Sequence, residues 1–267
     1  MEKIGLIAGN RKFPLIFSEA AKKNGCFIVA VAIKGDTSPK LKKLVDKIYW
    51  LGLDEFRRVF EIFKEEGVSR VAMAGQISPR RLFSKEIDRD EELKTLLKNI
   101  RDRKADSIFG AIAQKLEGEG LTLIDSTTFI KGLLPTKGIL TKCSPSASLW
   151  LDIRFGLEQA KAIAGLDIGQ TVAVKDKAVV AVEALEGTDN LIRRAGAIAR
   201  AGFTVVKVSK PKQDVRFDVP VVGLATIKNL IRSGAKCLAI EADKTLFIDR
   251  EQSMRLADRH NICIVAA

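Results

Sequence analysis

Two short loops in the C-terminal half of the chain carry most of the side chains that could perform chemistry. The first loop reads EALEGTDN and places two carboxylates, Glu183 and Glu186, just before a predicted helix. A helix N-terminus offers unpaired N–H groups, so this setting suits a diphosphate that is bridged by a divalent cation. The alternative is structural, because Thr188 or Asp189 can cap the helix that follows Gly187.

The second loop reads SKPKQDVRFDVPVVG and mixes cations with two carboxylates. Lys210 and Arg216 can hold phosphate oxygens, while Asp214 or Asp218 can bind Mg²⁺ or take a proton from an attacking water. A polar surface loop would show the same composition. The apolar VPVVG favours the functional interpretation, because it would anchor both carboxylates to a core.

These two loops lie at the ends of one predicted helix, residues 189–201, and one predicted strand, residues 203–208. We therefore expect both loops to converge on a single ligand. Arg193 and Arg194 stand one turn into that helix and would add positive charge to such a site.

Three loops in the N-terminal half follow predicted strands: residues 9–13, 34–36 and 75–80. In a doubly wound parallel sheet, ligands bind outside the carboxyl ends of the strands, so these loops form the expected ligand-facing edge. The first loop, AGNRKFP, has a single glycine where the dinucleotide fingerprint needs GxGxxG, so NAD or FAD binding has little support. Its backbone N–H groups could receive a phosphate or a uracil-type ring, or the loop could be a tight turn without a ligand.

The order of the predicted elements indicates an α/β fold with two domains. Apolar strands alternate with helices up to about residue 124, which predicts an N-terminal Rossmann-like domain with a parallel sheet over residues 1–130. A segment rich in glycine and proline, residues 131–145, is predicted to be the interdomain linker. Residues 146–267 then combine a predicted hairpin at Asp176-Lys177 with helices and further strands, which predicts a C-terminal α/β catalytic domain with a mixed sheet.

Composition narrows the chemistry further. The chain has 267 residues and a net charge of +12, which favours an anionic partner such as a nucleotide or an anionic membrane surface. Much of this charge lies on ordinary surface, since residues 79–106 resemble a solvated helix of mixed charge.

The chain has a single histidine, His260, which excludes a histidine-rich metal centre. Hydrolysis would therefore have to rely on carboxylates and cations. Four widely spaced cysteines signal neither zinc nor a disulfide framework and fit the reducing cytoplasm. No stretch approaches the roughly 18 apolar residues of a membrane-spanning helix.

Four motifs together resemble one known family. GLIAGNRKFPL, LPTKGILTKCSP, AVEALEGTD and KPKQDVRFDVPVVG are similar, in this order and over nearly the whole chain, to the LpxI-type UDP-2,3-diacylglucosamine pyrophosphatases of bacterial lipid A biosynthesis. The resemblance implies a cytoplasmic enzyme peripheral to the inner membrane, with its substrate bound between two domains. It also implies hydrolysis dependent on Mg²⁺ (or Mn²⁺) to UMP and 2,3-diacylglucosamine 1-phosphate, by attack of water on the sugar-side phosphorus.

A catalytic aspartate belongs to the family pattern and falls on the QDVRFD loop, where Asp214 and Asp218 stay equal candidates. The other candidate residues combine this resemblance with the loop chemistry described above. The candidate catalytic residues are Asp214, Asp218, Asp189, Thr188 and Lys210; the candidate metal ligands are Asp214, Asp218, Glu183 and Glu186; the candidate substrate-binding residues are Gly9, Asn10, Pro14, Gly75, Gln76, Gly187, Arg193 and Arg216.

Two other classes of function compete with hydrolysis. A non-catalytic nucleotide or nucleotide-sugar binding protein needs only the N-terminal loops. Nucleic-acid binding rests on net charge alone, and the chain lacks aromatic residues interleaved with its basic ones, so no nucleic-acid partner is expected. The oligomeric state stays open, with a homodimer among the alternatives.

Overall fold

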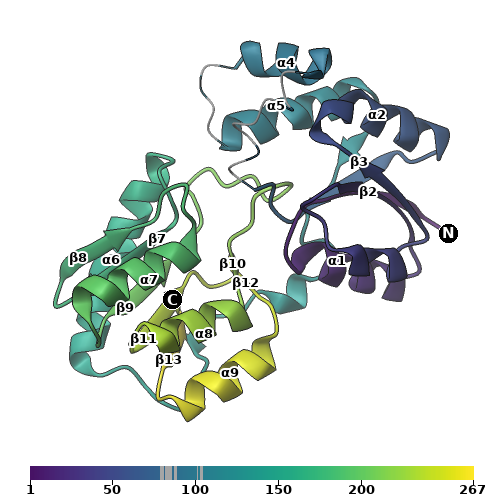
Figure 1. Cartoon of the computed structure of the whole chain (residues 1–267). Helices are drawn as coiled ribbons and strands as arrows, with labels where there is room; N and C mark the ends of the chain where they lie inside the picture. Colours follow the sequence, from purple (N-terminus) through teal and green to yellow (C-terminus); the bar gives the residue numbers. More distant parts are fainter. Residues whose placement is uncertain (79–80, 82–85, 87–88, 101, 103–104) are drawn as a thin grey trace. The chain divides into compact units, whose positions relative to one another are not determined.

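The computed structural model describes the whole chain except residues 79–80, 82–85, 87–88, 101 and 103–104 (Figure 1). It contains two compact units: Met1–Lys131 together with Asp214–Asp218, and Gly132–Gln213 together with Val219–Ala267. The sequence predicted that Asp214–Asp218 would belong to the C-terminal domain, so its place in the first unit differs from that expectation.

A parallel five-stranded sheet forms the centre of the first unit. The strands β1 (Lys3–Ala8), β2 (Phe27–Ile33), β3 (Lys47–Leu51), β4 (Arg70–Ala74) and β5 (Thr122–Leu123) lie in the order β3-β2-β1-β4-β5. The strands β1, β2 and β4 are almost entirely buried, as expected for apolar strands that are covered on both faces. This order confirms the predicted Rossmann-like fold and places the reversal of strand order between β1 and β4.

Helices cover both faces of this sheet (Figure 1). The helices α2 (Phe56–Glu65) and α5 (Ala105–Gly118) share one apolar core with Val29 and Val31 of β2. Helix α1 (Phe13–Lys23) covers the other face, and short 3₁₀ turns occupy Pro39–Lys43 and Leu53–Glu55. The segment 79–106, predicted to be a mixed-charge helix, contains helix α4 (Glu91–Lys98) and the first residues of α5, and several of its other residues lie outside the described residues.

The second unit has a six-stranded sheet in the order β6-β13-β11-β9-β7-β8. The sheet is mixed, which confirms the mixed sheet predicted for the C-terminal domain. The strands β9, β11 and β13 are mutually parallel, whereas β7 runs antiparallel to both β8 and β9, and β6 antiparallel to β13. The strands are β6 (Gly138–Ile139), β7 (Thr171–Lys175), β8 (Ala178–Val182), β9 (Thr204–Lys207), β11 (Cys237–Ile240) and β13 (Cys263–Ala266). Because β6 pairs with β13, part of the predicted linker 131–145 is an edge strand of this sheet.

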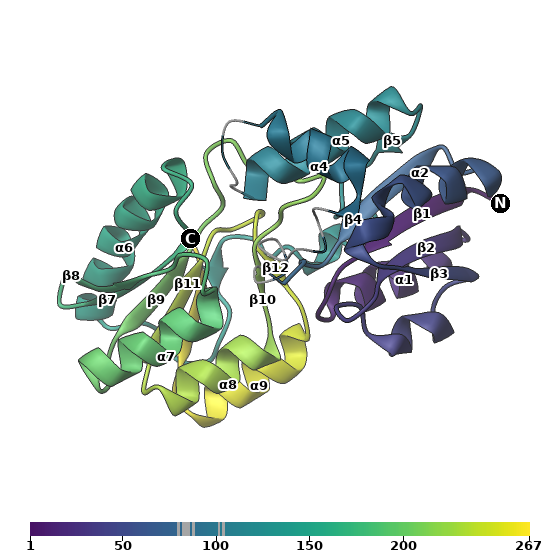
Figure 2. The ribbon, with the colours of Figure 1, turned by 45° about the horizontal axis from the view of Figure 1, so that its top comes forward.

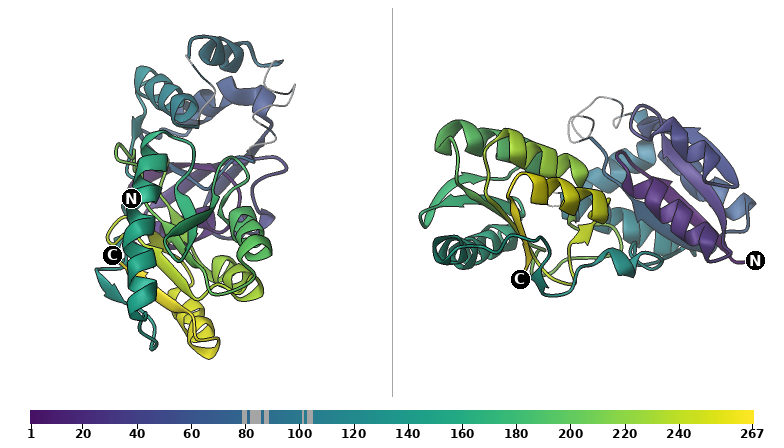
Figure 3. Two further views of the ribbon diagram at one scale, coloured as in Figure 1. Left: turned by 90° about the vertical axis from the view of Figure 1, so that its left-hand side faces the viewer. Right: turned by 90° about the horizontal axis from the view of Figure 1, so that it is seen from below.

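Two helix layers enclose the second sheet (Figure 3). Helix α6 (Ala147–Gly165) packs on one face, where Gly156 allows close contact with Val206 of β9. The other face carries α7 (Thr188–Ala199), α8 (Leu224–Arg232) and α9 (Arg250–Arg259), whose apolar sides share one core with the sheet (Figure 2). The remaining short elements are the 3₁₀ turn Lys131–Leu133 and the strand pair β10 (Val221–Val222) and β12 (Leu246–Phe247).

Within the part of the chain that the structure describes, none of the helices combines the length and the apolar character needed to cross a bilayer.

Candidate active site

The loops after β1 and β4 meet at the point where the strand order of the first sheet reverses. Asn10 and Gln76 form a β-bridge, with the Asn10 N–H donating to the Gln76 carbonyl at 2.8 Å. Gly75 has a positive φ of 88°, and a Cβ there would lie 2.6 Å from the Asn10 carbonyl oxygen and 3.0 Å from Pro14. A Cβ at Gly9 would likewise lie only 2.7 Å from the backbone nitrogen and oxygen of Gln76. The structure therefore brings together Gly9, Asn10, Pro14, Gly75 and Gln76, five of the six residues of this unit that were predicted to bind substrate; the sixth, Arg216, lies in the loop Asp214–Asp218.

One polar atom at this junction has no hydrogen-bond partner among the described residues. It is the side-chain oxygen of Asn10, which is buried. Helix α1, which starts at Phe13, has no side chain capping its first turn. A buried free acceptor suits a polar ring that carries an N–H donor. The first turn of α1 offers little to a phosphate, because Pro14 has no N–H and the N–H groups of Leu15 and Ile16 donate to the Lys12 carbonyl.

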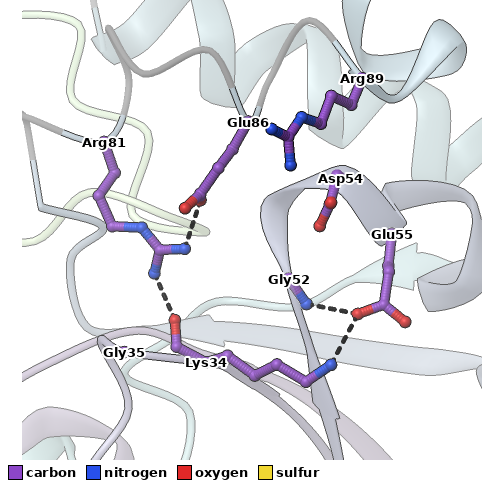
Figure 4. Close-up of a pocket in the computed structure, with 8 residues that line it drawn as sticks. All are labelled: Lys34, Gly35, Gly52, Asp54, Glu55, Arg81, Glu86 and Arg89. Atoms are coloured by element: carbon purple, nitrogen blue, oxygen red, sulfur yellow. Dashed lines mark hydrogen bonds and ion pairs between the residues drawn. The ribbon is translucent and has the colours of Figure 1, made fainter.

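A polar hollow of about 660 Å³ lies at the carboxyl ends of β2 and β3 (Figure 4). It includes Lys34 and Gly35 of the predicted loop 34–36, whereas residues 79–80 of the predicted loop 75–80 lie outside the described residues. Arg81 connects two sides of this hollow, because its guanidinium donates to the Lys34 carbonyl and forms an ion pair with Glu86 at 2.7 Å. The lining is Lys34, Gly35, Gly52, Asp54, Glu55, Arg81, Glu86 and Arg89.

The acid-bearing loop Asp214–Asp218 is fixed within the first unit. Arg216 is held between Asp214, at 2.7 Å, and Glu117 of α5, also at 2.7 Å. The hydrogen bonds that Arg216 donates to Asp214 lower the pKa of that carboxyl, although partial burial opposes them. A side-chain hydrogen bond also anchors this loop, because the Ser126 hydroxyl donates to the Val215 carbonyl at 2.8 Å. Asp214 is thus a tethered carboxylate, and Asp218 stands one turn away, its N–H donating to the Asp214 carbonyl at 3.0 Å.

A buried charged cluster lies at the carboxyl edge of the second sheet, where the first loop was predicted to act. Lys207, the last residue of β9, donates to the Thr188 hydroxyl at 2.8 Å, and that hydroxyl donates to Glu183 at 2.7 Å. Glu183 and Lys207 are each 7% exposed. Burial raises the pKa of Glu183, but the charge of Lys207 and hydrogen bonds from Thr171 and Thr188 outweigh it and leave the pKa lowered. The cluster fixes the first residue of α7, which starts directly after Gly187.

A second charged cluster follows β9 and β11 at the same edge. Glu241 accepts hydrogen bonds from Lys161 at 2.6 Å and from the Ser209 hydroxyl at 2.8 Å. Burial opposes ionisation of Glu241, yet these donors and Lys244 lower its pKa to about 2. Lys210, a candidate catalytic residue, lies beside this cluster and pairs with Asp167 at 2.7 Å.

Sequence reasoning missed Lys207, Ser209, Glu241 and Lys161. Lys207 and Glu241 each stand at the end of an apolar strand, TVVK and CLAIE. Charged residues are rarely buried unless they are paired, so a lysine or glutamate that closes a buried strand was the available signal.

Three other candidates lie apart from these clusters. Glu186 pairs with Arg194, and Asp189 accepts a hydrogen bond of 2.9 Å from the Asn229 amide. Arg193 lines a separate hollow between α7 and α8. Among the described residues, no group of three or more His, Cys, Asp or Glu side chains is arranged to hold a metal ion.

The two acid-bearing loops thus belong to different compact units, Glu183 and Glu186 to the second and Asp214 and Asp218 to the first. Their convergence on one ligand stays a prediction. The structure does bring Glu183 and Thr188 together, and it adds Lys207 to them.

These features define a two-unit α/β protein with a Rossmann-like first unit and polar or charged clusters at the carboxyl edges of both sheets. Residues 3–133 match the model of the LpxI N-terminal domain, and residues 136–265 match that of the LpxI C-terminal domain. The chain is 31% identical to UDP-2,3-diacylglucosamine pyrophosphatase LpxI of Caulobacter vibrioides, over 97% of this chain and 95% of that protein. The chain belongs to the LpxI family.

Solved structures offer only distant likenesses. The biotin carboxylase subunit of pyruvate carboxylase is 16% identical with a TM-score of 0.29, over 75% of this chain and 42% of that chain. N5-carboxyaminoimidazole ribonucleotide synthetase from Thermotoga maritima is also 16% identical, with a TM-score of 0.26 over 68% and 41% of the two chains. This chain spans less than half the length of either structure, and likenesses of this size carry no conclusion about function.

Proposed function

We propose that this protein hydrolyses the diphosphate of UDP-2,3-diacylglucosamine to UMP and 2,3-diacylglucosamine 1-phosphate (lipid X) in lipid A biosynthesis. The observation that carries the proposal is the match to UDP-2,3-diacylglucosamine pyrophosphatase LpxI of Caulobacter vibrioides over nearly the full length of both chains. The enzyme would work in the cytoplasm at the surface of the inner membrane, where a lipid with two acyl chains is found.

The Asp214–Asp218 loop supplies the carboxylate that activates water in this proposal. Arg216 donates to both oxygens of Asp214, at 3.0 and 2.7 Å, and lowers its pKa, which makes that carboxylate a weak base. We therefore assign proton abstraction to Asp218 and assign to Asp214 the task of holding Arg216 and the shape of the loop. Water then attacks the sugar-side phosphorus, and UMP leaves.

The edge of the first sheet supplies the nucleotide site. The buried side-chain oxygen of Asn10, which accepts no hydrogen bond from the described residues, supports binding of a base that carries an N–H donor there. In the second unit, Lys210 and the N-terminus of α7 at Thr188 would stabilise negative charge on the diphosphate.

Mg²⁺ or Mn²⁺ is part of the proposal as an inference from the family. The described residues provide no cage of three or more ligands, so they fit only the mode in which Mg²⁺ is held by one or two carboxylates together with substrate phosphates. A cation bound in this mode would neutralise charge that develops on the phosphates.

Hydrolysis in water enriched with ¹⁸O tests the reaction and its direction together. The purified protein, supplied with UDP-2,3-diacylglucosamine and Mg²⁺, should release UMP and place the label on 2,3-diacylglucosamine 1-phosphate, as mass spectrometry of both products would show. Label on UMP would contradict attack at the sugar-side phosphorus. Binding of the substrate without any UMP, across pH and divalent metals, would instead identify a nucleotide-sugar binding protein.

A further inference from the structure

The segment that contains α7, β9 and α8 is far more basic than the rest of the chain. Residues 187–213 and 219–236, all in the second unit, contain only one acidic residue, Asp189, which accepts the Asn229 amide. The basic residues of these two ranges are Arg193, Arg194, Arg200, Lys207, Lys210, Lys212, Lys228, Arg232 and Lys236.

Several of these cations surround a hollow of about 320 Å³ between α7 and α8. Arg193, Arg200 and Arg232 line it, and all three residues are exposed. Within the described residues, the side chains of Arg200, Arg232 and the nearby Lys228 make no hydrogen bond or ion pair. Their charge is therefore not neutralised by the protein itself.

The two helices hold this hollow in a fixed shape. A Cβ at Gly196 of α7 would lie 2.7 Å from the Ser233 carbonyl oxygen, so the absence of a side chain lets the helices touch there. Just beyond the helices, the Gly202 N–H donates to the Gly234 carbonyl at 2.8 Å. The backbones that carry Arg200 and Arg232 are thus tied directly to each other.

Helix α7 exposes one large apolar side chain, Ile198, which is 60% exposed. Ile198 lies about 140° around the helix from Arg193 and does not line the hollow, so it adds nothing to this face. The ligand preference of the hollow is therefore set by its exposed cations, which attract the anionic headgroups of a bilayer surface.

We propose that the outer face of α7 and α8 docks on an anionic phospholipid bilayer, with headgroup phosphates bound between Arg200 and Arg232. This inference rests on the proposed function, because that substrate is a membrane lipid. A helix layer that lies flat on the bilayer keeps the carboxyl edge of the same sheet, where Thr188 begins α7, within about one helix diameter (~10 Å) of the lipid surface. Nucleic acid fits the face less well, since no aromatic side chain lines the hollow for a base to stack on.

Flotation with lipid vesicles tests the docking face. The full-length protein should bind vesicles that contain phosphatidylglycerol and not vesicles of phosphatidylcholine alone. The double variant Arg200→Gln/Arg232→Gln should lose about thirtyfold in vesicle affinity, from two charges near an anionic surface. The matched control is Arg154→Gln/Lys177→Gln, which removes the same charge from exposed positions on α6 and in the β7–β8 turn beside it, on the opposite face of the sheet, and should lose less than about threefold. Equal losses in both pairs, no wild-type preference for anionic vesicles, or a loss of polynucleotide affinity in place of vesicle affinity would overturn the proposal.

An activity comparison separates this inference from the proposed function. With substrate dispersed in neutral detergent micelles, Arg200→Gln/Arg232→Gln should match the wild type, whereas with substrate in phosphatidylglycerol vesicles its turnover should fall in parallel with vesicle binding. Equal loss in micelles would overturn the docking role. A wild-type protein that binds anionic vesicles through these arginines but releases no UMP in either form would contradict the proposed function and leave the docking face standing.

Discussion

Nζ of Lys207 lies 3.8 Å from Oε2 of Glu183, and both side chains are about nine-tenths buried. The Thr188 hydroxyl stands between them, accepting from one and donating to the other. A charged pair in such a place costs desolvation free energy that only its mutual attraction and hydrogen bonds offset. The pair of Lys207 and Glu183 also fixes Thr188, the first residue of α7, at the edge of the sheet where the diphosphate is proposed to lie.

Removing one partner of this pair should destabilise the second unit strongly. Lys207→Met leaves Glu183 as an uncompensated buried charge, at a cost of about 3–5 kcal/mol in the free energy of unfolding. Urea unfolding, followed by Trp150 fluorescence in a Trp50→Phe background, reports on this unit. Lys207→Met/Glu183→Leu should recover part of the loss. The control Arg255→Met breaks an exposed pair and should cost at most about 1 kcal/mol; a similar loss in both single variants would contradict the assignment.

The ionised Glu241, paired with Lys161, should make the free energy of unfolding depend on pH in the acid range. The pKa of Glu241 is lowered from 4.5 to about 2 in the folded protein, so its ionised form stabilises the fold above pH 4.5. That contribution should disappear as the pH falls from about 4.5 to about 2. Glu241→Gln lacks it at every pH, so its deficit in unfolding free energy relative to the wild type should be largest at neutral pH and should shrink across this window. Urea unfolding at a series of pH values measures the deficit, and a deficit independent of pH would contradict the role of the charge.

The sequence predicted the order of the main elements because buried parallel strands appear as continuous apolar runs. FIVAVAI was predicted as one such strand and is β2, and VSRVAMA was predicted as another, of which Arg70–Ala74 is β4. The two-residue strand Gly138–Ile139 could not be predicted, because it exists only through its pairing with Val265 and Ala266 at the far end of the chain.

The site was predicted less completely than the fold, for a related reason. The pairing of Lys207 with Glu183, and of Glu241 with Lys161, joins residues from different elements and leaves no local pattern. The same holds for the loop at Asp214–Asp218, whose anchor runs from Val215 to Ser126, 89 residues away. Gly9, Asn10, Gly75 and Gln76 were predictable because each directly follows a parallel strand at one edge of the sheet.

Gly75 should tolerate no side chain. Its φ of 88° is unfavourable for alanine, and a Cβ would also overlap the Asn10 carbonyl oxygen at 2.6 Å. Gly120 is the matched control, since its φ is 80° but nothing lies within 4 Å of a Cβ placed there. Gly120→Ala should cost about 1–2 kcal/mol of unfolding free energy from backbone strain alone, and Gly75→Ala about 1–3 kcal/mol more from the overlap. Thermal unfolding and UDP binding measured side by side should show that only Gly75→Ala weakens both; equal behaviour of the two variants would contradict the tight junction.

The two aspartates of the QDVRFD loop should separate by kinetics. If Asp218 takes the proton from water, Asp218→Asn should lower kcat by about 10²–10⁴-fold with little change in KM. Asp214→Asn keeps the shape of its side chain but weakens the hold on Arg216, so we expect a smaller fall in kcat, together with a lower free energy of unfolding of the first unit. Glu117→Gln, which touches Arg216 from α5 and retains an acceptor, is the control and should stay close to the wild type. Initial rates of UMP release and urea unfolding, measured for all three variants, decide the matter. A collapse of kcat in Asp214→Asn with unchanged stability, beside a mild effect in Asp218→Asn, would reverse the two assignments and would mean that Arg216 orients a base instead of neutralising a structural carboxylate.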